Sequence, residues 1–263
     1  MTPVTAGAPL TSGNARVKEA RKLSRRSVRS ERRLFLADGP KAVEGALAVP
    51  GCVAEVFATA AGAQRYAPLL EGVPVTLVDD KAMAGLSDSV TPAGVVALCH
   101  HLDVPQRTLV EPRLVAICAE VRDPGNAGTV IRCADAAGAD GVVLAGDSVD
   151  AYNPKTVRAS VGSLFHLPIS VERDAATAVR AAQEAGLVVL AADGAGDVDL
   201  FEAESLLAGP TAWLFGNEAW GLPEELAALA DHVVRIPIFG AAESLNLSTA
   251  AALCLYASAR AHR

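Results

Sequence analysis

The chain has 263 residues, of which 51% are hydrophobic and 20% charged, enough to bury one large core or a medium core and a smaller domain. Its five cysteines occur singly, which argues against a disulfide framework or a zinc site, so we predict no bound metal. The longest apolar stretch, residues 245–259, is shorter than the roughly 20 residues that span a bilayer, and the N-terminus lacks a secretion signal. We therefore expect a cytoplasmic protein that makes no membrane contact.

The net charge of −7 argues against a nucleic-acid partner, but the basic residues are unevenly distributed. Residues 14–33 carry nine Lys or Arg and two Glu, a local balance of +7, so the remaining residues carry −14. A basic stripe on an acidic body indicates a polyanion such as RNA, although a basic helix that is only solvated remains the alternative. The candidate RNA-binding residues are Arg16, Lys18, Arg21, Lys22, Arg25 and Arg26.

The first half of the chain predicts a small α/β domain over residues 14–102. Residues 1–13 are small and polar and are predicted to be a disordered tail. One basic helix is expected over residues 16–33, with Val17, Ala20 and Leu23 on its apolar face. Strands are then expected at residues 34–36, 53–58, 73–78 and 94–98, and helices at 40–49, 62–70 and 83–87. Residues 103–113 contain two prolines and several charges and are predicted to be a linker.

Residues 114–263 form the second predicted domain, in which the strands are apolar runs without polar alternation. Such strands are typical of a parallel sheet that helices cover on both faces. They are expected at residues 114–119, 141–145, 187–191, 212–215 and 233–236, with helices beginning near Asn126, Asn153, Asp174, Leu200, Pro223 and Leu245. Gly138 and Gly186 are expected to end two of these helices. The predicted fold class is α/β with a mostly parallel sheet.

Polar loops follow three of these strands, at the place where ligand sites of open α/β sheets gather. The first loop, residues 122–132, contains Asn126, which is expected to cap the following helix, and Arg132, which is expected to be partly buried near its second turn. An arginine in that place suggests a functional role. The alternative is that Asn126 is only a cap and that Arg132 pairs with Asp135.

The second loop, residues 214–225, begins with Gly216, where a ligand could approach the backbone closely. Glu218 then offers a carboxylate before a helix that starts with proline. The alternative is an ordinary turn marked by glycine and proline, with Trp220 filling space in the core.

The third loop, residues 235–248, leads from a strand into the last helix and is rich in hydroxyl and amide side chains. Ser244 is the expected N-cap of that helix, and Asn246 lies two residues further on. One cap is ordinary, but two hydroxyls and an amide within five residues provide the hydrogen-bonding groups that a polar substrate needs.

Taken together, the three loops resemble motifs 1, 2 and 3 of the SpoU/TrmH branch of the SPOUT methyltransferases. The matching patterns are N-x-G-x-x-x-R at residues 126–132, L-F-G-N-E-x-x-G-L at 214–222 and I-P-I…S-L-N-L-S at 236–248. The first domain is similar to the substrate-binding domain of this family at residues 14–18, 35–39 and 87–97, with Asp38 in place of the usual glutamate.

The resemblance implies an S-adenosylmethionine-dependent RNA ribose 2′-O-methyltransferase. It implies a trefoil knot in the second domain, an L30e-like first domain, and a homodimer with its site at the subunit interface. The implied reaction centre is Asn126, Arg132, Glu218, Ser244 and Asn246, and the implied cofactor contacts are Gly216, Asn217, Ile236 and Leu245. Ribosomal RNA is the first expected substrate and transfer RNA the second.

Within this expected site, Arg132 is predicted to pair with a phosphate and stabilise the developing alkoxide, because a guanidinium is almost never neutral and makes a poor base. Glu218 is expected to position Asn126 or the ribose. A non-catalytic RNA-binding assembly factor is the alternative function, and the complete motifs argue against it. A nucleotide-dependent oxidoreductase would need G-x-G-x-x-G after the first strand, whereas residues 124–128 read P-G-N-A-G.

Overall fold

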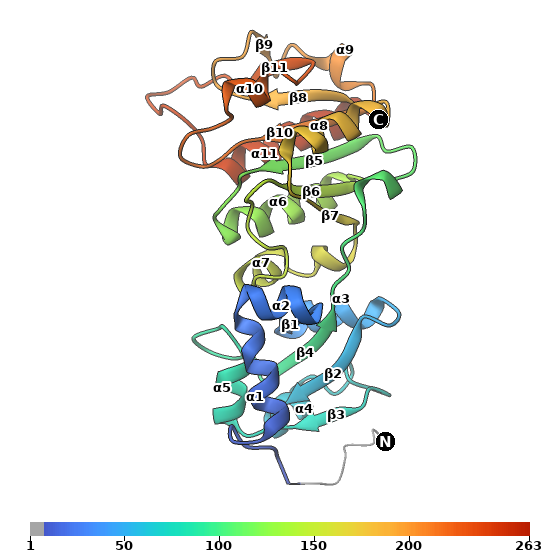
Figure 1. Cartoon of the computed structure of the whole chain (residues 1–263), viewed down its shortest axis with the longest axis vertical. Helices are drawn as coiled ribbons and strands as arrows, with labels where there is room; N and C mark the ends of the chain where they lie inside the picture. Colours follow the sequence, from blue (N-terminus) through green and yellow to red (C-terminus); the bar gives the residue numbers. More distant parts are fainter. Residues whose placement is uncertain (1–7) are drawn as a thin grey trace. The chain divides into compact units, whose positions relative to one another are not determined.

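The computed structural model describes residues 8–263, whose contacts group them into two units (Figure 1). The first unit contains residues up to Leu102 together with Tyr152–Phe165, and the second contains Asp103–Ala151 and His166–Arg263. None of the helices in the described part of the chain is long and apolar enough to cross a membrane. The predicted domain boundaries remain predictions.

The first unit is built on a four-stranded mixed sheet with the strand order β1-β4-β2-β3. Its strands are β1 (Leu34–Asp38), β2 (Val53–Ala58), β3 (Val75–Leu77) and β4 (Val95–His100), and its helices after β1 are α3 (Pro40–Ala48), α4 (Ala60–Arg65) and α5 (Asp80–Leu86). Strand β4 pairs antiparallel with β1 and β2, whereas β2 and β3 run parallel. The elements expected from the sequence are therefore present, with ends shifted by a few residues.

A segment from further along the chain completes the first unit. Helix α7 (Pro154–Ser160) and the 3₁₀ turn η3 (Ser163–Phe165) belong to it, although the sequence suggested a helix of the second domain near Asn153. Aromatic contacts explain the grouping, because the ring of Tyr152 lies 4.6 Å from that of Phe35 and 3.9 Å from that of His101. Such contacts do not appear in a local sequence pattern.

The prediction of a single basic helix over residues 16–33 is wrong, because the helix is interrupted in the middle of this segment. It forms α1 (Ala15–Arg21), the 3₁₀ turn η1 (Lys22–Ser24) and α2 (Arg26–Arg32), with Arg25 extended between them. The guanidinium of Arg29 is buried and donates to the carbonyls of Leu23 and Ser24. These carbonyls therefore have hydrogen-bond partners although the helix does not continue past them. The expected apolar face is confirmed, since Val17, Ala20 and Leu23 are buried.

The tail predicted for residues 1–13 lies partly outside the described residues, which begin at residue 8. Leu10 donates its N–H to the carbonyl of Leu77 at 2.8 Å and accepts from the N–H of Asp79 at 3.0 Å. It forms a parallel bridge to Val78, so this part of the predicted tail is held beside β3.

The second unit contains a seven-stranded sheet in the order β7-β6-β5-β10-β8-β11-β9. All its pairings in the described part are parallel. The strands are β5 (Leu114–Ala119), β6 (Gly141–Ala145), β7 (Ile169–Glu172), β8 (Val188–Ala192), β9 (Val198–Asp199), β10 (Thr211–Phe215) and β11 (His232–Arg235). The helices are α6 (Pro124–Ala137), α8 (Ala175–Glu184), α9 (Glu204–Leu207), α10 (Glu224–Ala227) and α11 (Leu247–Ala261). The expected mostly parallel sheet is confirmed.

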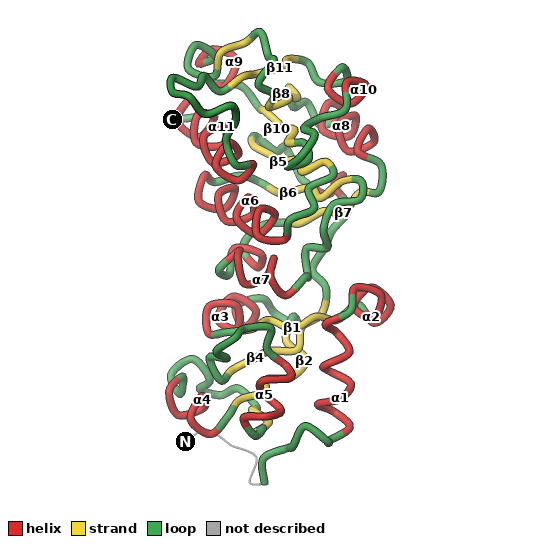
Figure 2. Tube along the Cα trace, turned by 90° about the vertical axis from the view of Figure 1, so that its left-hand side faces the viewer, coloured by secondary structure: helices red, strands yellow, loops and turns green. Residues whose placement is uncertain are grey.

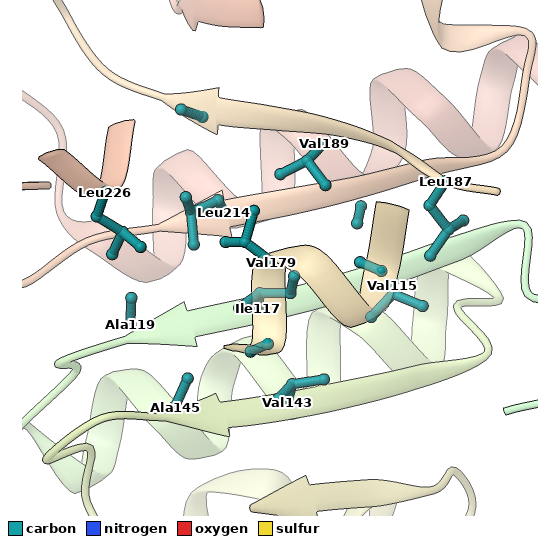
Figure 3. Close-up of a cluster of buried hydrophobic side chains, with 14 of the residues drawn as sticks. Val115, Ile117, Ala119, Val143, Ala145, Val179, Leu187, Val189, Leu214 and Leu226 are labelled. Atoms are coloured by element: carbon teal, nitrogen blue, oxygen red, sulfur yellow. The ribbon is translucent and has the colours of Figure 1, made fainter. Parts of the chain in front are cut away.

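Helices cover both faces of this sheet, with α6 and α11 on one side and α8 and α10 on the other (Figure 2). On the α8 side, alternate residues of the central strands, such as Ile117, Val189 and Leu214, form a buried cluster with Val179 (Figure 3). On the α11 side, the indole N–H of buried Trp213 donates to the hydroxyl of Ser258 at 2.9 Å. Burial on both faces explains why these strands lack polar alternation.

The linker predicted at residues 103–113 packs on the second unit. The N–H of Val104 donates to the carbonyl of Ile169 at 2.9 Å, and the side-chain amide of Gln106, in the 3₁₀ turn η2 (Gln106–Thr108), donates to the carbonyl of Ala178 at 2.9 Å. Leu109 contacts the hydrophobic core. This segment is therefore part of the second unit's packing.

The direction in which the chain adds strands to the sheet reverses beside β5. Strands β6 and β7 follow β5 on one side, and the later strands, beginning with β10 as the direct neighbour of β5, lie on the other side. In a parallel sheet the carboxyl ends of all strands meet at one edge, and a crevice opens beside such a reversal. The loops after β5, β8, β10 and β11 therefore converge at this edge. The trefoil knot implied by the resemblance remains a prediction.

Candidate active site

A chain of three polar side chains joins the motif loops at the carboxyl edge of the second sheet. Glu218, after β10, accepts at Oε1 a hydrogen bond of 3.1 Å from the amide nitrogen of Asn126, in the first turn of α6. The amide oxygen of Asn126 accepts one of 3.0 Å from the amide nitrogen of Asn246, which precedes α11. The fold thus brings together three of the five residues expected at the reaction centre.

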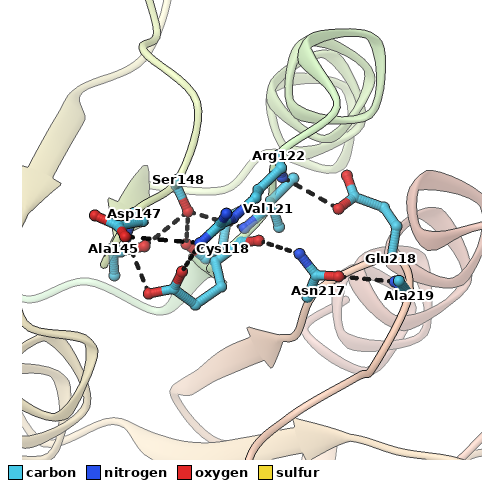
Figure 4. A network of polar contacts seen from close by, with 10 residues as sticks. Cys118, Val121, Arg122, Ala145, Asp147, Ser148, Asn217, Glu218 and Ala219 are labelled. Atoms are coloured by element: carbon cyan, nitrogen blue, oxygen red, sulfur yellow. Dashed lines mark hydrogen bonds and ion pairs between the residues drawn. The ribbon is translucent and has the colours of Figure 1, made fainter.

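Backbone N–H groups fix the carboxylate of Glu218 in place. The N–H of Arg122 donates to Oε2 at 3.1 Å (Figure 4), and the N–H of Asp123 donates to Oε1 at 3.0 Å. Partial burial by itself would raise the pKa of Glu218, but the hydrogen bonds from Arg122, from its own N–H, from Asn126 and from Asp123 outweigh that effect and lower the pKa. The carboxyl is therefore ionised at neutral pH and acts as a fixed acceptor.

Two expected helix caps are wrong. Helix α6 is capped by Asp123, whose Oδ1 accepts from the N–H of Asn126 at 2.9 Å, so the side chain of Asn126 points elsewhere. Helix α11 is capped by Asn246, whose Oδ1 accepts from the N–H of Ser248 at 2.9 Å, while Ser244 is exposed in the loop before it. In both loops the sequence offers two nearby polar residues with a similar propensity to cap a helix, and the prediction chose the one that does not cap it.

Arg132 lies outside the hydrogen-bonded chain. It follows Asn126 by six residues on α6, which turns its side chain by about 240° around the helix axis. The side chain is exposed, contrary to the expected partial burial. The alternative pairing with Asp135 is not formed either, and Asp135 instead bonds His166 at 2.8 Å.

A cavity of about 300 Å³ opens beside Glu218 at the same edge of the sheet. Its lining includes all four expected cofactor contacts, Gly216, Asn217, Ile236 and Leu245, together with Ser244. A Cβ atom on Gly216 would lie 2.4 Å from the carbonyl of Gly221, so only glycine fits where this loop closes on itself. Asn217 is buried and donates to the carbonyl of Glu120 at 2.7 Å, which anchors the loop to the strand end of β5.

Sequence reasoning did not select Asp193, which also lines the cavity. It directly follows β8, so the signal that identified the three loops, a polar residue after an apolar strand, was also present here. Its Oδ1 accepts from the N–H of Ala195 at 2.9 Å. With Glu243 it adds acidic groups to the cavity wall.

The chain is similar to proteins of known class over almost its entire length. The SpoU rRNA methylase family matches residues 113–256, and the MRM3-like substrate-binding domain matches residues 14–97. The chain belongs to the SpoU rRNA methylase family. The activity class and the cofactor expected from the sequence, an RNA 2′-O-methyltransferase that uses S-adenosylmethionine, are confirmed by this membership and by the relatives that follow.

Among curated relatives, the 23S rRNA (guanosine(2553)-2′-O)-methyltransferase RlmP of Bacillus subtilis is 35% identical over 92% of this chain and 95% of its own length. Among solved structures, an AdoMet-bound rRNA methyltransferase from Sinorhizobium meliloti has a TM-score of 0.84 and 34% identity, covering 97% of this chain and 98% of its own. The SpoU methyltransferase AviRb from Streptomyces viridochromogenes with AdoMet has a TM-score of 0.80 and 31% identity, covering 94% and 98%.

The residues of the cavity fit S-adenosylmethionine. Val234, Ile236 and Leu247 offer apolar surface for an adenine ring, and Asp193 and Glu243 place negative charge near a cofactor that carries a sulfonium and an ammonium group. The glycine at position 216 allows a ligand to approach the backbone of this loop. Shape and charge at this edge of the sheet therefore suit the SpoU family's cofactor.

Proposed function

We propose that this enzyme methylates a ribose 2′-hydroxyl of 23S ribosomal RNA, with the ribose held by the chain of Glu218, Asn126 and Asn246. The observation that carries the proposal is that this hydrogen-bonded chain ends beside the cavity that suits the cofactor. RlmP, the uridine(2479) methyltransferase of Streptomyces viridochromogenes and the RlmB proteins, all similar to this chain, are named for 2′-O-methylation of 23S rRNA.

S-adenosylmethionine supplies an electrophilic methyl group when it is bound, so the protein's task is to place the 2′-oxygen and to manage its proton. Each side-chain amide has two N–H donors. Asn126 uses one on Glu218, and Asn246 uses one on Asn126, so each retains one donor of fixed direction. These two donors hold the ribose oxygen and stabilise the negative charge that develops as it loses its proton.

Ser244 and Arg132 complete the proposed reaction centre. The hydroxyl of Ser244 lies on the cavity wall and orients the ribose. Arg132 pairs with a phosphate next to the target ribose and stabilises the developing alkoxide, since its guanidinium stays charged. Arg132 does not reach the chain of Glu218, Asn126 and Asn246 within one subunit, so this role needs a partner.

A homodimer provides that partner. Helix α11 packs beside α6, where the hydroxyl of Tyr256 lies 3.5 Å from the carbonyl of Ala136, and Leu253 and Tyr256 are exposed. Two such faces on a two-fold axis would bury these apolar side chains and carry Arg132 of one subunit towards the site of the other. We also place the enzyme in the cytoplasm, a reducing compartment in which its five free cysteines stay reduced.

The contacts of the first unit reduce the set of RNA-binding candidates. Arg16 is paired with Glu55, and Lys22 is paired with Glu19 at 2.5 Å, so both have structural partners. The exposed residues Lys18, Arg21, Arg25 and Arg26 are the stronger candidates for phosphate contacts. The first unit then binds the RNA and the second performs the transfer.

Mapping of 2′-O-methyl groups in ribosomal and transfer RNA from a deletion strain tests this function. We expect the loss of a methyl group from 23S rRNA, restored by a plasmid copy of the gene. Loss of a transfer RNA methyl group instead would reassign the substrate. An unchanged RNA, with no cofactor binding in calorimetry, would favour the non-catalytic assembly factor.

A further inference from the structure

Arg122 and Trp220 lie against each other beside the candidate active site. Arg122 comes shortly after β5, and Trp220 lies in the short loop between Asn217 and Gly221. The guanidinium carbon of Arg122 is 5.5 Å from the centroid of the Trp220 ring, within the range of about 6 Å in which a cation and an aromatic face attract each other. The two side chains form a cation–π pair from two different loops.

Both loops are held firmly. The N–H of Asn217 donates to the carbonyl of Gly221 at 2.8 Å, and the N–H of Gly221 donates back at 3.0 Å, which closes the loop that carries Trp220. Arg122 donates to Glu120 at 3.2 Å and lies 3.6 Å from a carboxylate oxygen of Asp147 (Figure 4). These carboxylates keep the guanidinium in place over the Trp220 ring.

The pair is exposed although it is well ordered by these contacts. Trp220 is 57% exposed, whereas Trp213, the other tryptophan of the chain, is fully buried. The alternative interpretation, in which Trp220 fills space in the core, is therefore wrong. An exposed indole ring that a neighbouring guanidinium holds in place offers a surface on which a planar group can stack.

The charge around the pair indicates what kind of ligand this is. Glu120 and Asp147 already neutralise Arg122, and Glu218 adds a third carboxylate nearby. A phosphate would be repelled by these carboxylates, whereas an uncharged base would not. Nucleobases of unpaired RNA stack on aromatic rings and on guanidinium planes, so the pair suits a base.

The pair is coupled to the site through the backbone. The N–H of Arg122 donates to Oε2 of Glu218, and Trp220 follows Glu218 by two residues. A base on this surface would therefore be next to a ribose at Asn126. We propose that Arg122 and Trp220 form a stacking subsite for a nucleobase of the RNA at or beside the methylated nucleotide. This inference rests on the proposed function and adds a residue pair that binds the RNA.

The test measures RNA affinity and methyl transfer separately, on in vitro transcribed, unmodified bacterial 23S rRNA. Trp220→Ala is expected to weaken RNA binding by roughly 10-fold to 100-fold, the scale of losing one stacked base, and to raise KM more than it lowers kcat. Trp220→Phe, which retains a ring, is expected to restore most of the affinity. Binding of S-adenosylmethionine is expected to stay within about 2-fold of wild type in both variants.

Arg122→Met tests the guanidinium, and Arg180→Met is its matched control. Arg180 lies on α8, its side chain is 55% exposed against 54% for Arg122, and it too pairs with a carboxylate at 3.6 Å. We expect about 10-fold weaker RNA binding for Arg122→Met and no change for Arg180→Met.

Three results would overturn the subsite. They are unchanged RNA affinity in Trp220→Ala, a failure of Trp220→Phe to restore affinity together with lost cofactor binding, and an altered subunit assembly of Trp220→Ala in size-exclusion chromatography. If the wild-type protein binds RNA but transfers no methyl group, the proposed reaction is contradicted. The RNA affinities of the variants would still test the subsite in that case.

Discussion

At the residue scale, the site depends on amide groups whose two ends have different partners. Asn126 donates to Glu218 and accepts from Asn246, and Asn246 also caps α11 through its oxygen. These partners set the direction of each amide, so the donors that remain are aimed before any substrate arrives. Preorganised donors of this kind stabilise a developing charge without the cost of reorienting solvent.

Arg132→Ala is expected to lower the rate of methyl transfer at least about 100-fold, the scale of losing a positioned catalytic group. Cofactor binding should be unchanged, because Arg132 is on α6 and not in the cavity wall. Single-turnover kinetics with calorimetry in parallel measure both effects. A rate near that of wild type would refute the proposed role.

Glu218→Gln is expected to reduce the free energy of unfolding by about 1 kcal/mol at pH 7, because charge-assisted hydrogen bonds are lost at a partly exposed position. The pKa of Glu218 is lowered in the folded protein, so its contribution is complete above the ordinary value of 4.5 and disappears as the pH falls through the lower folded value. Urea titrations followed by tryptophan fluorescence, which reports on the second unit, should show a difference that shrinks below pH 4.5. A difference that does not change with pH would contradict the ionised anchor.

The sequence predicted which residues form the hydrogen-bonded chain of the site, but not which of the neighbouring polar residues cap the helices. The motif pattern placed Asn126, Glu218 and Asn246 at strand ends of one sheet, and parallel topology then requires them to meet. It could not decide between neighbouring polar residues as helix caps, because Asp123 and Asn126, or Ser244 and Asn246, have similar cap propensities. The direction of Arg132 follows from helical geometry, but whether another subunit meets it does not.

At the element scale, the apolar strands were predicted well because both faces of the sheet are buried, and the two that were missed lie at its edges. Strand β7 ends in Ser170, Val171 and Glu172, and β9 has only two residues, so neither gives an apolar run. The basic segment was predicted in composition but not in shape. Its break depends on the buried side chain of Arg29, which local periodicity does not reveal.

Reversal of charge at Arg25 and Arg26, to Glu, is expected to weaken RNA binding and to reduce its dependence on salt, because fewer counterions are released. Both residues are exposed around the break between η1 and α2, so the fold should tolerate the change. Filter binding at several salt concentrations gives affinity and slope together. Reversal of Arg107, in η2 of the second unit, is a control for charge reversal elsewhere on the surface. Unchanged binding by the Arg25 and Arg26 variant would exclude this surface.

At the scale of the whole molecule, the contacts group the chain into two units and join α7 to the first unit across a long stretch of chain. The predicted domain boundaries stay predictions, because a local sequence pattern does not show such long-range contacts.

The proposed homodimer cannot be seen in the structure of a single chain. Its support comes from exposed Leu253 and Tyr256 on α11 and from the position of Arg132, which points away from the polar chain of its own subunit.

Mixing two inactive variants tests whether the site is shared between subunits. Dimers that combine Arg132→Ala with Asn126→Asp would contain one intact site, so an equilibrated equal mixture should regain roughly a quarter of wild-type activity. Each variant mixed with itself is the control. No recovery after verified subunit exchange would place Arg132 and Asn126 in the same subunit's site or outside it.

The most direct measurement of the central claim is the identity of the methylated atom. Purified protein is incubated with unmodified 23S rRNA and methyl-labelled S-adenosylmethionine, and the RNA is digested to nucleosides and analysed by mass spectrometry. We predict label in one 2′-O-methyl nucleoside, reduced at least about 100-fold by Asn126→Asp, which keeps the size of the side chain but removes its N–H donors. Label on a base, or equal label with the Asn126→Asp variant, would contradict the account.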